Sequence, residues 1–136
     1  MTAEPHVSVP FLSLALRGAP GSVREIRRDV RAFAAEYGAE GEALATIELA
    51  VSEAAANAVV HGCADGEGTV RVAADVEDGE LEVVVLDEGP GFTDEPGPGL
   101  GLGLGLGLMR RGAVAFEIRD RPEGGVEVWM RFPLAA

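Results

Sequence analysis

Near its middle, the sequence of 136 residues reads Glu53-Ala-Ala-Ala-Asn57-Ala-Val-Val-His61-Gly62. Glu53, Asn57 and His61 are four residues apart, so on a helix their side chains form one polar stripe. The rest of the stretch is apolar, and burying a carboxylate or an amide without partners costs several kcal/mol. Two interpretations follow: the stripe is a binding site, or it is the solvated face of an amphipathic helix.

The residues around this stripe predict a helix over about 42–60, which ends at Gly62. Its core side would hold Leu44, Ile47, Val51, Ala54, Ala55 and Ala58. Upstream, Ser22 and Glu25 have the spacing of a capping box after a turn at 18–21, which predicts the start of another helix. Apolar residues then recur at helical spacing before Gly38, namely Val23, Ile26, Val30, Phe33 and Tyr37.

Strand patterns occupy most of the remaining sequence. Alternation over 7–17 and 70–76 predicts two strands, and Asp78-Gly79 predicts a hairpin turn into an apolar strand over 81–86. After a short helix at about 104–111, a last hairpin over 113–120 and 126–132 is expected. This order predicts one α/β (α+β) domain over 1–136, a two-layer sandwich with a mixed, mostly antiparallel sheet and helices on one face.

The charge is strongly acidic, with 23 acidic against 11 basic residues and a net charge of −12. All eleven basic residues are arginine, so mechanisms that require a lysine are excluded. The balance argues against direct nucleic-acid binding, which depends on neutralising phosphates. It fits either simple solubility or an acidic face that binds a basic partner. With neither a signal peptide nor a membrane span expected and a single cysteine, we expect a cytoplasmic protein.

Asp87 follows the apolar run 83–86, where a buried strand would leave the sheet. It opens the sequence Asp87-Glu88-Gly89-Pro90-Gly91-Phe92, whose two glycines permit a tight turn and the close approach of a ligand. A carboxylate at such a strand end can accept a hydrogen bond from an exocyclic amine, such as that of adenine. The alternative is an ordinary turn, because Asp, Gly and Pro are turn formers.

Residues 97–108 carry glycine at every odd position up to 107. No Gly-x-Gly of the repeat has a third glycine five residues after its first one, so the dinucleotide fingerprint is absent. The lysine-containing phosphate loop is excluded as well. A glycine-lined segment that leads into a short helix can still bind phosphates through backbone N–H groups. A low-complexity linker is the other interpretation, although it would not require the five leucines of this repeat.

Together these three motifs resemble the N, G1 and G2 boxes of the GHKL ATPases, the superfamily that includes gyrase, the histidine kinases and MutL. The N box corresponds to 53–62, the G1 box to 87–92 and the G2 box to 103–111. The resemblance covers about 11–132 and is closest to the small bacterial anti-sigma factor serine/threonine kinases. It implies the Bergerat ATP-binding fold, with ATP and Mg²⁺ as cofactors.

The resemblance also implies a role for individual residues. Asn57 would coordinate Mg²⁺, and Glu53 would be the catalytic general base that deprotonates the attacking hydroxyl. Asp87 would bind the adenine amino group. The other nucleotide-binding residues would be Gly89 and Gly91 in the adenine pocket, and Gly103, Leu104, Gly105 and Leu106 at the phosphates.

In function, the resemblance implies an ATP-binding anti-sigma factor. Such a protein sequesters a sigma factor and phosphorylates a small anti-sigma factor antagonist, and a homodimer is also implied. The chain departs from this branch in three places. Residues 92–107 hold no Arg, Lys or His, Gly125-Val126 stands where the family usually has Gly-Thr, and the Gly-Leu repeat is longer than usual. The alternative is therefore a non-catalytic switch of the same fold, gated by nucleotide or independent of it.

Overall fold

The computed structural model describes residues 10–62, 68–88 and 115–135. Along the chain its elements are β1 (Phe11–Arg17), α1 (Pro20–Glu36), α2 (Gly41–Asn57), the π-helical turn η1 (Ala58–Gly62), β2 (Thr69–Glu77), β3 (Glu80–Asp87), β4 (Ala115–Asp120) and β5 (Val126–Pro133). The short helix expected at 104–111 lies outside the described residues, as do the first residues of the strands expected at 7–17 and 113–120.

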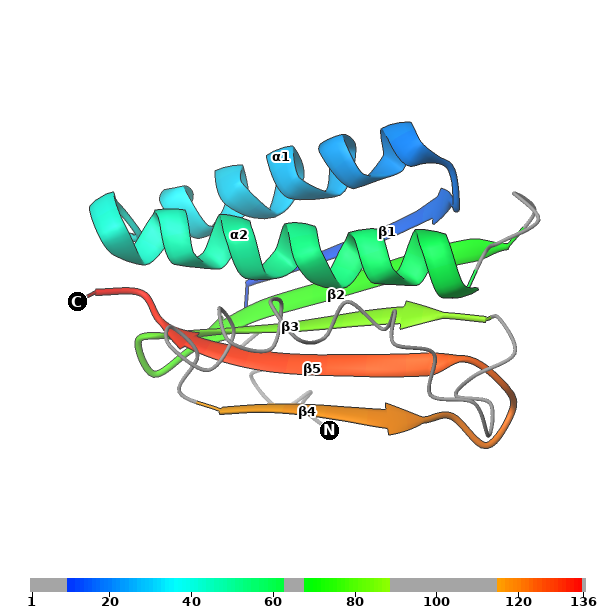
Figure 1. Ribbon diagram of the computed structural model, residues 1–136. Helices are drawn as coiled ribbons and strands as arrows, with labels where there is room; N and C mark the ends of the chain where they lie inside the picture. The colour runs from blue at the N-terminus through cyan, green and yellow to red at the C-terminus, as the bar shows by residue number, and fades with distance from the viewer. Residues whose placement is uncertain (1–9, 63–67, 89–114, 136) are drawn as a thin grey trace, which may run out of the picture.

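The five described strands form one sheet in the order β1-β2-β3-β5-β4. All four pairings between them are antiparallel. Helices α1 and α2 lie side by side on the same face of this sheet (Figure 1). The predicted two-layer α+β fold with helices on one face is therefore confirmed.

The core lies between the two helices and the inner face of the sheet. Strand side chains alternate between this core and the outer face, because successive residues of a strand point to opposite sides. The largest fully buried side chains come from both layers: Ile26, Val30, Ile47, Val51, Val70, Val72, Leu81, Val83, Val85, Met130 and Phe132. All six residues predicted for the core side of the second helix are buried.

The start of α1 differs from the prediction. Its N-cap is Ala19, and no side chain caps the helix. Pro20 occupies the first turn, where its fixed φ and missing N–H suit a helix start, so the helix begins before Ser22. Ser22 is buried, and its hydroxyl donates to the carbonyl oxygen of Arg17. The capping box was therefore the wrong interpretation of the Ser22 and Glu25 spacing.

The end of α1 explains why Tyr37 is less buried than its spacing predicts. The helix ends at Glu36, so Tyr37 is the C-cap and is 38% exposed. Its ring packs against Phe33, with the ring centroids 5.1 Å apart. Gly38 follows with φ of 113°, a conformation that glycine adopts readily after a helix.

Helix α2 and the start of η1 form the most apolar helical segment of the described chain. Gly41–Val60 is long and apolar enough to cross a membrane by length and composition alone. The packing supplies another reason for this composition, since α2 buries Leu44, Ile47 and Val51 against the rest of the fold. A central core helix passes the same test, so the segment carries no evidence for a membrane span.

The outer face of the sheet carries a group of acidic side chains. Asp75 on β2 lies opposite Glu82 on β3 in the strand register. Glu82 accepts a hydrogen bond from the indole N–H of Trp129, with 2.6 Å between the nitrogen and Oε2. Burial raises the pKa of the Asp75 carboxyl, and the nearby carboxylates of Glu82 and Glu77 raise it further.

This raised pKa predicts that the Asp75 charge opposes folding at neutral pH. Between the ordinary pKa of 3.8 and the higher folded-state pKa, the folded protein binds more protons than the unfolded chain. Stability therefore falls as pH rises through that interval. We expect Asp75→Asn to raise the melting temperature at neutral pH and to lose this advantage below about pH 3.8.

Thermal unfolding followed by circular dichroism across pH tests this expectation. Glu25→Gln, at an exposed position on α1, is the control for the loss of one negative charge. A lower melting temperature for Asp75→Asn at neutral pH, with an unchanged control, would show that Asp75 stabilises the fold instead.

Candidate nucleotide-binding site

Glu53 and Asn57 lie in the last turns of α2, and both are half-buried. Ala54, Ala55 and Ala58 beside them are buried, so this polar pair runs along the border between core and solvent. The α-helical pattern changes to π-helical directly after Asn57. Short π-helical segments are frequent at functional sites. The side chain of His61, the third member of the predicted stripe, is outside the described part of the structure.

The fold brings the end of α2 and the end of β3 to the same end of the molecule. Figure 1 shows the C-terminal end of α2 above the sheet where the β3 arrow ends. Turn η1, which continues α2 from Ala58, contacts β3. Asn57 is the last residue of α2 and Asp87 is the last residue of β3, so the two predicted site residues come from adjacent element ends.

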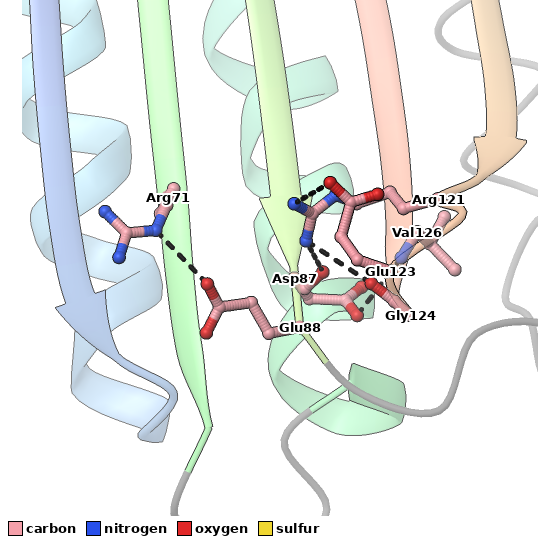
Figure 2. A network of polar contacts seen from close by, with 7 residues as sticks. All are labelled: Arg71, Asp87, Glu88, Arg121, Glu123, Gly124 and Val126. Carbon is pink, nitrogen blue, oxygen red and sulfur yellow. Dashed lines mark hydrogen bonds and ion pairs between the residues drawn. The ribbon is translucent and has the colours of Figure 1, made fainter.

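Asp87 is one of the two polar or charged residues that are buried in the described structure, with 4% of its surface exposed. Its carboxylate Oδ1 accepts a hydrogen bond from the backbone N–H of Val126, at 3.3 Å. Its backbone carbonyl accepts from Arg121 Nη1, at 3.1 Å (Figure 2). The turn between β4 and β5, together with the first residue of β5, thus contacts both the side chain and the main chain of Asp87.

That turn is closed by its own hydrogen bonds. The N–H of Arg121 donates to the carbonyl of Gly125, and the N–H of Gly124 donates to the carbonyl of Arg121, both at 2.9 Å. Arg121 Nη1 also donates to the Gly124 carbonyl, at 3.3 Å. The guanidinium therefore ties the turn together and joins it to Asp87.

Gly125 has φ of 98°, and a Cβ atom there would lie 1.9 Å from the carbonyl oxygen of Asp87. Only glycine permits this close approach of two backbones. Arg121 was not among the predicted site residues. The close backbone approach of Gly125 had a signal in the sequence, the glycine pair at 124–125, because consecutive glycines in a hairpin indicate backbone that other residues cannot adopt.

Glu88 follows Asp87 and is exposed. Its Oε2 lies 3.3 Å from Nε of Arg71 on β2, and about half of each side chain is accessible to solvent (Figure 2). Exposed ion pairs contribute little to stability, so this contact is a minor restraint on the chain as it leaves β3.

The remaining predicted nucleotide-binding residues lie outside the described residues: Gly89, Gly91, Gly103, Leu104, Gly105 and Leu106. Their roles stay predictions. The part of the candidate site that the structure describes consists of the end of α2, the end of β3 and the turn before β5.

The described residues fit the implied cofactors chemically. They contain no group of three or more His, Cys, Asp or Glu side chains that could hold a metal ion. Mg²⁺ is commonly bound by one or two protein oxygens together with water and phosphate oxygens, so the amide oxygen of Asn57 suits it without such a group. The carboxylate of Asp87 is an acceptor at a buried strand end, which suits the amine of a purine base.

Comparison with known proteins identifies the family. The family model described as the histidine kinase-like ATPase domain matches residues 16–132. The chain therefore belongs to the histidine kinase-like ATPases, as its three motifs predicted. Membership of an ATPase family implies that the domain binds ATP.

Curated relatives include the anti-sigma F factor of Shouchella clausii, 42% identical over 95 residues, which are 69% of this chain and 65% of the relative. The anti-sigma F factor of Clostridium acetobutylicum is 42% identical over 66 residues, 48% of this chain and 46% of the relative. The matches thus span less than two thirds of each relative. The predicted proximity to the anti-sigma factor branch is confirmed.

A solved structure has the same fold. The crystal structure of the RsbU and RsbW domains of Rv1364c from Mycobacterium tuberculosis matches with a TM-score of 0.70 and 29% sequence identity. The match covers 92% of this chain and 32% of that one.

The contact between Gly125 and Asp87 generates a prediction about stability. Gly125→Ala adds both a strained φ and a clash with backbone, whereas Gly79→Ala adds a strained φ of 78° in open space. We expect Gly79→Ala to lower the free energy of unfolding by about 1–2 kcal/mol, the cost of a left-handed conformation. Gly125→Ala should cost about 1–3 kcal/mol more, because backbone must move.

Urea denaturation of both variants and the parent protein measures the difference. Equal losses for the two alanine variants would contradict the close packing of Gly125 against Asp87.

Proposed function

We propose that this protein is an ATP-binding anti-sigma factor with serine/threonine kinase activity. It sequesters a sigma factor and phosphorylates a small antagonist protein, and it acts in the cytoplasm. The observation that carries the proposal is the placement of Glu53 and Asn57 at the end of α2, beside the end of β3 that bears the buried Asp87. The anti-sigma F factors among its relatives support the choice of partners.

Asp87 selects the base. Its carboxylate is a hydrogen-bond acceptor held at the end of a buried strand, and adenine presents an amine that can donate to it. Guanine presents a carbonyl oxygen at the same ring position, which would face the carboxylate lone pairs. The hydrogen bond that adenine donates to the carboxylate is lost with guanine, so ATP is preferred over GTP.

Asn57 and Glu53 act at the phosphate end. The amide oxygen of Asn57 would hold Mg²⁺, which would neutralise negative charge on the phosphates. Glu53 lies one helical turn earlier on the same side of α2. Its carboxylate accepts the proton of the serine or threonine hydroxyl as that oxygen attacks the terminal phosphate, and ADP leaves with the electron pair of the broken P–O bond.

A second candidate function is a binding module without phosphate transfer. The sequence observation that favours it is the lack of any Arg, Lys or His over 92–107, where kinases of the resembled branch usually carry a basic residue near the terminal phosphate. In that case the domain binds the sigma factor alone, with nucleotide as a regulator or without it. Phosphate transfer to the antagonist distinguishes the two functions.

We expect Asn57→Ala to weaken Mg-ATP binding strongly and to keep the fold, because the half-buried amide binds the metal and is not part of the core. Isothermal calorimetry measures the affinity, and far-UV circular dichroism verifies the fold. Ser52→Ala is the matched control, since its hydroxyl donates to the Glu48 carbonyl of the same helix, at 2.7 Å. Wild-type ATP affinity in Asn57→Ala would remove Asn57 from the site.

Glu53→Gln tests the reaction itself. The amide is nearly isosteric with the carboxylate but cannot accept the hydroxyl proton, so phosphate transfer should be abolished while ATP and sigma-factor binding persist. Transfer of radioactive phosphate from ATP to purified antagonist is the measurement. Glu48→Gln on the same helix, where the native carboxylate pairs with Arg27 and Arg31, is the control.

Two results would change the assignment. If Glu53→Gln transfers phosphate at the wild-type rate, Glu53 is not the base. If the wild-type protein transfers none to any candidate antagonist but binds the sigma factor, the binding module is the correct function.

A further inference from the structure

The turn before β5 restrains Asp87 more closely than ordinary strand pairing would. We call this contact the Arg121 clasp; it consists of Arg121, Gly124, Gly125 and Val126 around Asp87. The described β3–β5 ladder ends with the pair Leu86 and Glu127. One residue further on, the N–H of Val126 donates to the Asp87 carboxylate, while Arg121 supplies a donor to the Asp87 carbonyl. Figure 2 shows these contacts converging on one residue.

The guanidinium of Arg121 contacts several groups of the clasp at once. Nη1 donates to two carbonyl oxygens, those of Asp87 and Gly124, at 3.1 and 3.3 Å. Nη2 lies 3.5 Å from Oε2 of Glu123, and the Arg121 side chain is 17% exposed. A planar fork can satisfy several acceptors at once in a fixed arrangement, which a single ammonium on a flexible stem cannot reproduce.

Glu123 is a peripheral part of this arrangement. Its side chain is 68% exposed, and its ion pair with Arg121 lies at the solvent side of the turn. Such a pair contributes little. The two carbonyl contacts of Nη1 therefore hold the clasp, and the contact with Glu123 does not.

The clasp also fixes where the Asp87 carboxylate points. The carboxylate rotates about its side-chain bonds unless its oxygens are held, and Val126 N–H holds Oδ1 only while the turn stays against Asp87. Because Gly125 has no side chain, the turn can lie this close to the Asp87 carbonyl. Arg121 bridges the same carbonyl and the turn, so it keeps the donor of Val126 in register with the carboxylate.

We propose that Arg121 is a positioning residue that gives the site its preference for adenine over guanine by holding the Asp87 carboxylate in one orientation. The inference rests on the proposed nucleotide function. It adds that base selection depends on a side chain from the turn between β4 and β5. The clasp includes Gly125-Val126, the position where the resembled family usually has Gly-Thr.

The test uses the full chain with three substitutions: Arg121→Lys, Arg121→Met and Glu123→Gln. Calorimetry gives the Kd of each for Mg-ATP and for Mg-GTP. In both Arg121 variants the ratio of the GTP Kd to the ATP Kd should fall at least about fivefold, the effect expected when a charge-assisted hydrogen bond is lost. In Glu123→Gln the ratio should stay within about twofold of the wild type, as expected for an exposed ion pair.

The ratio distinguishes positioning from a purely structural role. If both Kd values rise by the same factor in the Arg121 variants, Arg121 only stabilises the domain and the inference is wrong. If Arg121→Lys keeps the wild-type ratio, charge and not fork geometry holds Asp87, which also overturns the mechanism.

A second measurement needs no nucleotide. Amide hydrogen exchange at Val126 should be faster in both Arg121 variants, whereas the amides of Val83 and Val85 in the core of β3 should exchange as in the wild type. Unchanged protection at Val126 would reject the clasp. If the wild-type protein binds neither ATP nor GTP, the proposed nucleotide function fails; if it prefers ATP and the variants keep that preference, the inference about Arg121 alone fails.

Discussion

The close packing of α2 against the sheet is the constraint on which the rest of the structure depends. Buried alanines line this side of the helix, and a small side chain lets the helix approach the strands closely. Because α2 and η1 both contact β3, the polar end of the helix is placed beside the polar end of the strand. The same apolar surface that stabilises the fold therefore also positions the proposed site residues Glu53, Asn57 and Asp87 relative to one another. A longer side chain at Ala54 or Ala55 would change both the packing of α2 and the position of these residues.

The burial of Asp87 is a second constraint on the candidate site. A carboxylate at 4% exposure requires hydrogen-bond donors, and the fold supplies one from the backbone of β5. The alternation of β3 places Asp87 on the inner face after Leu81, Val83 and Val85. The site is thus a continuation of the core, in which the last inward position of a central strand carries a charged group in place of an apolar one.

The spacing of apolar residues predicted the described helices and strands and most of their core residues. Repeats of 2 residues in strands and 3.6 residues in helices reflect which side of an element is buried. It failed at Ser22, where Pro20 starts the helix earlier than the apparent capping box. The polar residues of α2 and Asp87 were predicted from their spacing and from the resemblance that three ordered motifs carry together. Arg121 could not be predicted, because its partners are carbonyl groups of Asp87 and Gly124, and such contacts leave no periodic trace in the sequence.

The strand order has a consequence for the time at which the site is completed. β5 is the last of the described strands along the chain, yet it lies between β3 and β4 in the sheet, and its first residue contacts Asp87. During synthesis the chain emerges from its N-terminus onward, so α2 and β3 leave the ribosome well before the residues that hold Asp87. A nascent chain that ends before Val126 can form the helical layer and the first hairpin, but its Asp87 lacks the donor from β5. The base recognition proposed for Asp87 is therefore available only after the hairpin of β4 and β5 has docked beside β3.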